Sequence, residues 1–427
     1  MSLTKLSKSI IKLSGQDTTS FLNGLVTTRF LPNIIKKNQH TISDVDIRHA
    51  HLNEILDLKK DWGIMHEDLY DPENHIMIRR DGVSSMFLNA KGRVLTDCFI
   101  YPYVTPKQDP QFMIEVENSI TSKLMFMLNM YKLGAKVSFE ETSLKSYYLY
   151  HDSVEFDEYL EDLQAKYCFT FNPKDANKQS AQMIEDEVLV NKKEAGKLVG
   201  LAIDNRIPNF GIKLVTDGEI DESFLSDSFK AQFPIKMVEE TEYRQRRFLN
   251  GLFEASDAPK NFQLLPFDMN IDYINGMSAD KGCYVGQELT SRTYNGGVLR
   301  KRIFPFQFFE LTDEKLAQVD ELDHLKLEIN DCATEDLSST GLENLEVTPL
   351  IEKEVSEEAV ASPFGKMKKR KSNIGKILSV QDNLGFILLR LESVKETYFK
   401  VEVPCLNTKY IGIKIMRPNW WPEDDRF

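Results

Sequence analysis

The 427-residue sequence has few cysteines, and no two of them form a C-x-x-C pair. An odd number of scattered thiols is typical of a protein from a reducing compartment, and it argues against a disulfide framework. A local four-cysteine zinc or iron–sulfur site is excluded within this chain, because such sites need clustered thiolates. The five cysteines are Cys98, Cys168, Cys283, Cys332 and Cys405.

The sequence also lacks long apolar runs and a basic field. No stretch of eighteen apolar residues occurs, so the sequence predicts no membrane span. The formal net charge of −13 argues against a general nucleic-acid binder, which usually carries a basic surface. Residues 311–360 hold 15 Asp and Glu against 3 Lys, so the remaining chain is close to neutral. The acidity therefore belongs to one segment and says little about the folded body.

No glycine-rich phosphate loop and no repeated strand–helix–strand period is present. Short apolar runs at residues 86–89, 93–100 and 112–116 instead predict strands, with a glycine turn between the first two. Apolar side chains at helical spacing predict a helix over residues 119–131. The length predicts about two to three domains. We therefore expect an α+β fold with largely antiparallel sheets.

The first fifteen residues carry two signals. They contain three lysines and several hydroxyl side chains, and no acidic residue precedes Asp17, which is typical of a transit peptide. The apolar pattern at residues 10–13 equally predicts a first strand that leads into a globular body. One segment can carry both signals. After this strand, Asp17 is expected to cap a short helix, which Asn23 and Gly24 can end early.

Two charged features are open to a functional interpretation. Asp97 lies inside an otherwise apolar strand, where its carboxylate either faces solvent on an alternating face or lines a pocket. A basic patch lies on a helix predicted within residues 241–256, and it consists of Arg244, Arg246 and Arg247. A solvated helix face is the default interpretation of such a patch, and an anion-contacting surface is the alternative.

The strongest concentration of special chemistry is the stretch KGCYVGQELTSR at residues 281–292. Gly282 and Gly286 let the backbone turn sharply, or admit a ligand or another chain closely. Cys283 stands between them, beside Lys281 and just before an expected helix start, and this setting favours a reactive thiolate. A buried structural thiol is the alternative interpretation.

The core KGCYVGQE at residues 281–288, followed by GGVLRKRIFPF at residues 296–306, resembles the signature of the YgfZ-type family of folate-binding-fold proteins. This family is related to the glycine-cleavage aminomethyltransferase, and its eukaryotic members are mitochondrial iron–sulfur cluster assembly factors. Further matches follow in the family order and span nearly the whole chain: SGQDTTSFLNGLVT at 14–27, FLNAKGRVLTD at 87–97, KLGAKVSFEE at 132–141, YRQRRFLNGLFEASD at 243–257 and IGKILSVQDNLGFILLRLE at 374–392.

The resemblance implies an aminomethyltransferase-like fold. Residues 1–300 would form two α+β modules around a central opening, and residues 301–427 would form a C-terminal β-barrel. Asp97 would fall where the related aminomethyltransferases carry the carboxylate that works at the folate amine. The sequence departs from the family pattern at two places, which we interpret as insertions: residues 33–75, and an acidic, flexible stretch of about residues 311–372.

The resemblance further implies an assembly factor of the mitochondrial matrix that helps A-type carrier proteins supply [4Fe–4S] clusters to client enzymes. Cys283 would be a thiolate ligand of a transient cluster shared with such a partner, because this chain lacks the clustered thiols to hold one alone. The implied binding surface comprises Lys281, Gly282, Cys283, Tyr284, Gly286, Gln287, Glu288 and Arg292.

The alternative function is a tetrahydrofolate-dependent one-carbon transferase, with tetrahydrofolate in the central opening and Asp97 in proton transfer. Against it, KGCYVGQE is the assembly-family version of this turn, and a cysteine has no evident role in aminomethyl transfer. The resemblance therefore favours an assembly factor over an enzyme. The net charge adds the expectation that no nucleic acid is among its partners.

Overall fold

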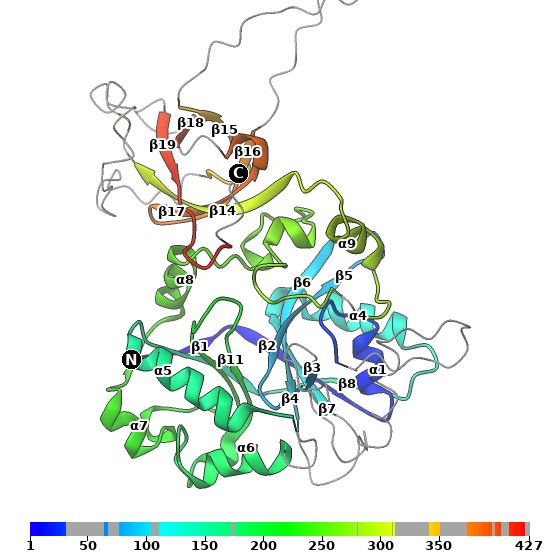
Figure 1. The fold of residues 1–427 in the computed structure, drawn as a ribbon, viewed down its shortest axis with the longest axis vertical. Coiled ribbons are helices and arrows are strands. Elements are labelled where there is room, and N and C mark those ends of the chain that lie inside the picture. The colour runs from blue at the N-terminus through cyan, green and yellow to red at the C-terminus, as the bar shows by residue number, and fades with distance from the viewer. Residues whose placement is uncertain are drawn as a thin grey trace, which may run out of the picture. The chain divides into compact units, whose positions relative to one another are not determined.

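The computed structural model describes most of the chain: residues 1–30, 64–66, 77–103, 111–171, 176–279, 281–309, 311, 341–350, 374–394, 398–402 and 410–422. These residues form two compact units (Figure 1), of which the first comprises residues 1–243 and 271–296 and the second comprises residues 244–270 and 297–427. Segment 244–270 groups with the C-terminal unit, which the sequence did not indicate. The predicted division at residue 300 stays a prediction.

The first unit contains two five-stranded sheets, with strand orders β11-β12-β9-β1-β13 and β5-β6-β7-β2-β8. The first sheet is built from β1 (Ser2–Leu6), β9 (Lys145–Tyr150), β11 (Leu198–Ile203), β12 (Ile212–Thr216) and β13 (Lys236–Met237). The second sheet is built from β2 (Lys8–Ser14), β5 (Val83–Leu88), β6 (Val94–Pro102), β7 (Gln111–Glu117) and β8 (Ser138–Glu141).

Strand pairing in both sheets is antiparallel, apart from the short parallel pairing of β1 with β13. The predicted α+β class with largely antiparallel sheets is therefore confirmed. The first fifteen residues form β1 and β2, which confirms the strand prediction for this segment. Its second signal, as a transit peptide, stays a prediction.

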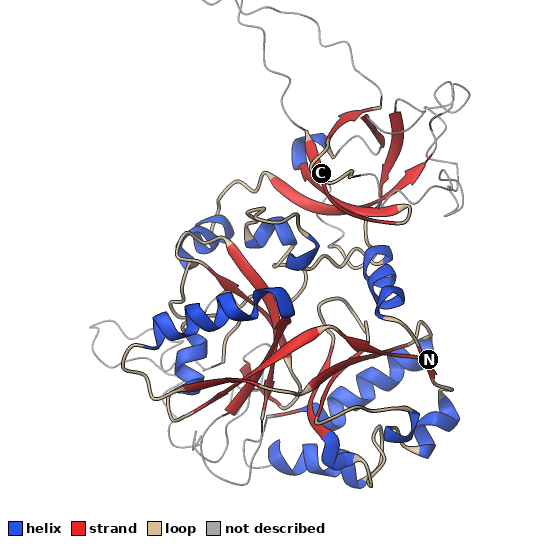
Figure 2. Cartoon of the chain, turned by 180° about the vertical axis from the view of Figure 1, so that it is seen from behind, coloured by secondary structure: helices blue, strands red, loops and turns tan. Residues whose placement is uncertain are grey.

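Helices cover one face of each sheet (Figure 2). The first sheet packs against α5 (Val154–Leu163), α6 (Ala176–Glu185) and α7 (Asp227–Gln232), which share one apolar core with it. The second sheet packs against α1 (Thr18–Asn23) and α4 (Thr121–Lys132). The helix predicted over residues 119–131 is thus confirmed as α4. In α4 and α5 the buried apolar side chains are spaced three or four residues apart, so they fall on one face of the helix.

The opposite faces of the two sheets meet in a smaller core formed by Ile10, Phe99, Tyr101, Met113, Ala202 and Val215. Because side chains alternate along a strand, β6 contributes to both sides of its sheet. Cys98 and Ile100 point to the helices, whereas Phe99 and Tyr101 point between the sheets. This alternation fixes the face on which Asp97 lies.

A small third sheet of order β10-β4-β3 completes the first unit. It consists of β3 (Ile64–His66), β4 (Met77–Arg79) and β10 (Phe169–Thr170). β3 lies within the segment 33–75 that the sequence suggested as an insertion, so this part belongs to a sheet. The rest of that segment lies outside the described residues.

The second unit contains a closed barrel of strand order β14-β17-β16-β15-β18-β19, which confirms the predicted C-terminal β-barrel. Its strands are β14 (Lys301–Phe309), β15 (Glu346–Pro349), β16 (Gly375–Gln381), β17 (Leu384–Arg390), β18 (Tyr398–Glu402) and β19 (Tyr410–Ile415). β15 falls within the predicted acidic insertion, most of which lies outside the described residues. Across the described part of the chain, no helix is long and apolar enough to cross a membrane.

Asp17 is the N-cap residue of α1, as predicted, but its side chain makes no capping hydrogen bond to the helix. Its carboxylate instead accepts a hydrogen bond from the backbone N–H of Lys136, at 2.8 Å. This tertiary contact takes the acceptor away from the helix. The predicted early end of α1 is confirmed, because the helix stops at Asn23 with Gly24 as its C-cap.

The solvated-face interpretation of the arginine patch is wrong for two of its three members. The patch lies on α8 (Glu240–Leu249), where Arg246 and Arg247 are buried. The Arg247 guanidinium donates to the Asp257 carboxylate at 2.8 Å and lies 3.7 Å from Glu254. The chain that follows α8 folds back and places these carboxylates beside the helix. The arginine is therefore neutralised inside the second unit.

Candidate functional site

The motif segment is tied to the connection that follows α1. The backbone N–H of Val285 donates to the carbonyl oxygen of Gly24, and that of Ser278 donates to Thr27, both at 3.1 Å. The Thr27 hydroxyl donates to the carbonyl oxygen of Gly276 at 2.6 Å. These hydrogen bonds join two stretches that are about 250 residues apart in sequence, and they satisfy backbone groups of both stretches.

Lys281 adds three more hydrogen bonds between the same two stretches. Its ammonium group donates to the carbonyl oxygens of Asn23, Val26 and Thr28, at 2.8, 2.5 and 2.8 Å. A lysine ammonium has three N–H donors, so all three are matched by acceptors. Burial, and then the charge of Arg29, lower the pKa of Lys281 to about 7. The three carbonyl oxygens favour the charged ammonium form of Lys281, because only this form has three N–H groups to donate.

The motif presents Cys283 to solvent. Lys281 and Tyr284 are buried, with 5% and 9% of their surfaces exposed, whereas Gly282 and Cys283 between them are exposed. The Lys281 Nζ atom also lies 4.8 Å from the centre of the Tyr284 ring, a cation–π contact that joins the two anchors. The alternative interpretation of Cys283 as a buried structural thiol is therefore wrong. The predicted influence of Lys281 on the thiolate stays a prediction.

The other described thiols are in a different environment. Cys98 and Cys168 are 4% and 3% exposed. Burial raises the pKa of both thiols well above the ordinary value, and the nearby charges of Asp97 and Asp81 raise them further. Both residues are therefore held as neutral thiols that an external ligand cannot reach. Cys332 and Cys405 lie outside the described residues.

Gly286 lets the motif approach the turn between β5 and β6. It has a φ of 78° and precedes α9 (Gln287–Tyr294). A Cβ atom at this position would lie 2.5 Å from the carbonyl oxygen of Asn89 and 3.1 Å from the Cα atom of Gly92. Only glycine combines this left-handed backbone with so close an approach. The turn residues of FLNAKGRVLTD and the motif glycine are thus in direct contact.

Replacing Gly286 with alanine is expected to lower the free energy of unfolding by about 2–4 kcal/mol, because the new methyl group meets backbone atoms and the φ is strained. Gly282 provides a matched control, since a Cβ atom there meets nothing within 4 Å. Gly282→Ala should stay within about 0.5 kcal/mol of the wild type. Urea unfolding of both variants measures the difference, and equal stabilities would contradict the packing described here.

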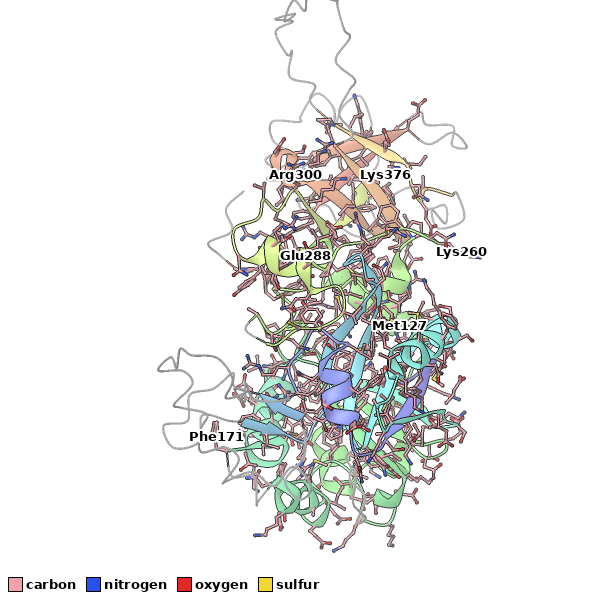
Figure 3. All side chains as sticks on the ribbon, turned by 90° about the vertical axis from the view of Figure 1, so that its right-hand side faces the viewer. Met127, Phe171, Lys260, Glu288, Arg300 and Lys376 are labelled. Carbon is pink, nitrogen blue, oxygen red and sulfur yellow. The ribbon has the colours of Figure 1, made fainter. Side chains whose placement is uncertain are left out.

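The remaining predicted binding residues divide into two kinds. Gln287 closes the turn, because its side-chain oxygen accepts from the backbone N–H of Tyr284 at 3.3 Å. Glu288 and Arg292 lie on the surface of α9, 87% and 70% exposed at their side chains, and pair with each other at 2.7 Å. Figure 3 labels Glu288 on this helix. The two charges are therefore accessible to a partner.

Asp97 lies on another part of the first unit. It is half-buried on β6, opposite Met86 of β5, and it shares its strand face with Phe99. The Phe99 ring has the Arg206 guanidinium 5.0 Å away and the Lys213 ammonium 4.8 Å away. The half-buried carboxylate thus belongs to the strand face that packs between the sheets, where the aromatic and cationic side chains are buried. Its predicted role in a pocket stays a prediction.

The structure also reveals a buried charge cluster that sequence reasoning missed. Lys213 pairs with Glu115 at 2.7 Å, and the Tyr101 hydroxyl donates to the same carboxylate at 2.5 Å. Arg206 pairs with Asp204 at 2.7 Å. Burial opposes the charge on Asp204, but Arg206 and then Lys213 outweigh it and hold the pKa of Asp204 below its ordinary value. Charged residues within otherwise apolar strands, Glu115 in FMIEVE and Lys213 in GIKLVT, were the available signal.

Two facing sheets followed by a closed barrel define an aminomethyltransferase-like fold. The structure is similar to the crystal structure of glycine cleavage system aminomethyltransferase T from Bartonella henselae, with a TM-score of 0.51 over 98% of this chain and 86% of that one. The sequence identity is 9%, so this likeness concerns the fold. Residues 300–423 match the family model described as CAF17, C-terminal beta-barrel domain.

Curated relatives identify the family. The sequence is 47% identical to an iron–sulfur cluster assembly factor IBA57 homolog, mitochondrial, from Debaryomyces hansenii, covering 99% of this chain and 98% of the relative. It is 46% identical to the Candida albicans homolog, with 98% of each chain covered, and 27% identical to the Saccharomyces cerevisiae protein, with 97% and 88% covered. The chain belongs to the IBA57 family of mitochondrial iron–sulfur cluster assembly factors.

Proposed function

We propose that this chain assists the maturation of [4Fe–4S] enzymes in the mitochondrial matrix, together with A-type carrier proteins. The observation that carries the proposal is the placement of Cys283, an exposed thiol between two buried anchors. Family membership supports an iron–sulfur assembly role, and the relatives are named as mitochondrial. The matrix, the carrier and the [4Fe–4S] clients are what the proposal adds.

The proposal takes the other ligands of the cluster from a second protein. Within the described residues, no group of three or more His, Cys, Asp and Glu side chains is placed to hold a metal ion. A transient cluster at Cys283, as cargo, would take its other thiolate ligands from the carrier. Gly282 has open space around it, so a partner's backbone can come close to the thiol. Glu288 and Arg292 would orient that partner by charge.

An anaerobic reconstitution tests the shared cluster. The full chain is mixed with an A-type carrier that holds a cluster, and visible absorption is recorded on the complex after gel filtration. The wild type should yield a coloured complex, and Cys283→Ala should not. Cys168→Ala is the matched control, because it removes a thiol that is buried in the core. Identical spectra for the wild type and Cys283→Ala would show that Cys283 is not a ligand.

A tetrahydrofolate-dependent one-carbon transferase is the second candidate, and one observation favours it. Asp97 lies half-buried on the strand face that carries Phe99. A carboxylate there can accept a hydrogen bond from a folate N–H group, whereas the Phe99 ring beside it is buried in the core between the sheets. The fit is partial, because the nearby cations Arg206 and Lys213 already pair with buried carboxylates. When bound, tetrahydrofolate would supply one-carbon carrier chemistry.

Anaerobic calorimetry with tetrahydrofolate tests this candidate. Asp97→Asn should weaken binding about tenfold, since one hydrogen bond to a charged group contributes roughly 1.5 kcal/mol. Cys283→Ala should bind as the wild type does. One-carbon transfer that depends on Asp97 would favour the transferase over the assembly factor. A wild type that binds no tetrahydrofolate removes the transferase from consideration.

A further inference from the structure

Helix α4 exposes an apolar face to solvent. Phe126 is 71% exposed and Met130 is 54% exposed, and Leu133, immediately after the last helical residue, is 89% exposed. Their spacing of four and three residues places them along one side of the helix. The other side carries Leu124 and Leu128, which are fully buried against the second sheet. α4 therefore buries one apolar face, and it also shows apolar side chains to water among polar ones.

The end of this apolar face is strained. Leu133 has a φ of 44° and a ψ of −117° at the C-terminal end of α4. A branched side chain rarely adopts a positive φ, and the next residue, Gly134, would adopt it without steric cost. Strained backbone persists where the surrounding structure holds it, and it concentrates at functional positions. The fold thus holds a leucine outward in solvent at some cost.

Lysines border the exposed face. Lys123 is exposed within α4, Lys132 ends the helix, and Lys136 is exposed just after it. No acidic residue occurs between residues 121 and 138, in a chain whose net charge is −13. The neighbouring carboxylate of Asp17 is bound to a backbone N–H, and Glu140 follows on β8. The face is therefore apolar at its centre and basic at its border.

We propose that this α4 face binds an anionic lipid surface. Phe126, Met130 and Leu133 would enter the boundary between headgroups and acyl chains, and the lysines would contact anionic headgroups. The helix that carries these exposed side chains covers one face of a sheet (Figure 2), and a lipid surface can receive apolar side chains without a complementary shape. The charge pattern selects an anionic surface over a neutral one.

The α4 face and the thiol motif belong to different elements. Figure 3 labels Met127 on α4 and Glu288 on α9, and no residue of the exposed α4 face is part of the motif. The inference is independent of the proposed function, because it rests on α4 alone and would hold whatever the motif binds.

Vesicle flotation with the full chain tests the proposal. The probes are phosphatidylcholine vesicles with and without cardiolipin. The wild type should float with the cardiolipin vesicles only, and added salt should weaken the association. A variant that combines Phe126→Ser, Met130→Ser and Leu133→Ser should bind at least about tenfold more weakly, because it loses the apolar insertion. A second variant, with Gln at Lys123, Lys132 and Lys136, should lose the preference for cardiolipin.

Val154→Ser is the matched control, since Val154 is an apolar residue of α5 with 69% exposure. It should float as the wild type does, and circular dichroism should show that every variant is folded. The proposal is overturned if the wild type ignores cardiolipin vesicles or if the serine variant binds as tightly as the wild type. It is also overturned if no form of the chain binds vesicles and the wild type, but not the serine variant, binds an acidic protein.

Discussion

Replacing Cys283 with serine is expected to abolish the contribution of this chain to [4Fe–4S] enzymes and to leave its fold intact. The Cys283 side chain is exposed, so the substitution should change the free energy of unfolding by less than about 0.5 kcal/mol. A serine hydroxyl is a poor substitute for a soft thiolate ligand of iron. Function and stability should therefore separate cleanly at this position.

The measurement uses cells that lack their own copy of the gene and express the variant instead. Aconitase, a [4Fe–4S] enzyme, and a [2Fe–2S] enzyme are assayed side by side in the same extracts. With Cys283→Ser, aconitase activity should fall to the level of the deletion strain, while the [2Fe–2S] enzyme stays near the wild-type level. A parallel loss of both enzymes would point to a more general role than the one proposed.

The matched control is Cys168→Ser, which also removes one thiol from the chain. Cys168 lies in the core of the first sheet and is 3% exposed, so a cluster shared with a partner cannot reach it. This variant is expected to lose stability, because a hydroxyl replaces a buried thiol, and yet to support aconitase while it remains folded. Full aconitase activity in the Cys283→Ser strain would exclude Cys283 as an essential ligand.

Short-range features of the fold were predictable because their signals are local. The glycine turn at Lys91 and Gly92 predicted the β5–β6 hairpin, and the apolar spacing of residues 119–131 predicted α4. The early end of α1 at Gly24 likewise follows from neighbouring residues. Each of these elements depends on residues within a few positions of one another, which is the range that periodicity and turn chemistry cover.

Contacts across the chain were not predictable from the same patterns. The sequence gives both Gly286 and the Asn89–Gly92 turn, but nothing in either stretch shows that they touch. Asp17 carries the residue type of a helix cap, and a backbone N–H far along the chain takes its carboxylate instead. Nearly every residue carries the same backbone N–H and C=O groups. The sequence therefore does not show which of them will bond to a distant side chain.

The candidate site shows the same division. The residue types around Cys283 were enough to predict a functional position. Its role as a cluster ligand came from the family resemblance. The orientation of its neighbour Lys281 could not be read from sequence, because adjacency suggested an influence on the thiol whereas the side chain reaches carbonyl oxygens about 250 residues earlier. The exposure of the thiol depends on this orientation, since Lys281 and Tyr284 are buried on either side of it.

Replacing Lys281 with methionine is expected to lower the free energy of unfolding by about 2–5 kcal/mol. Methionine fills a similar volume but donates no hydrogen bond, so three buried carbonyl oxygens would lose their shared partner. Lys281 is buried, so the loss of its hydrogen bonds is not compensated by water. Urea unfolding of the full chain, followed by circular dichroism, measures the change.

Lys91→Met is the matched control, because Lys91 is exposed in the β5–β6 turn and should change stability by less than about 0.5 kcal/mol. If Lys281→Met is as stable as the wild type, the hydrogen bonds from Lys281 to the three carbonyl oxygens contribute nothing to the free energy of unfolding. At a temperature where the variant stays folded, it keeps Cys283 but loses the anchor that positions it. A cluster yield between those of the wild type and Cys283→Ser would then show that placement of the thiol, as well as its presence, supports ligation.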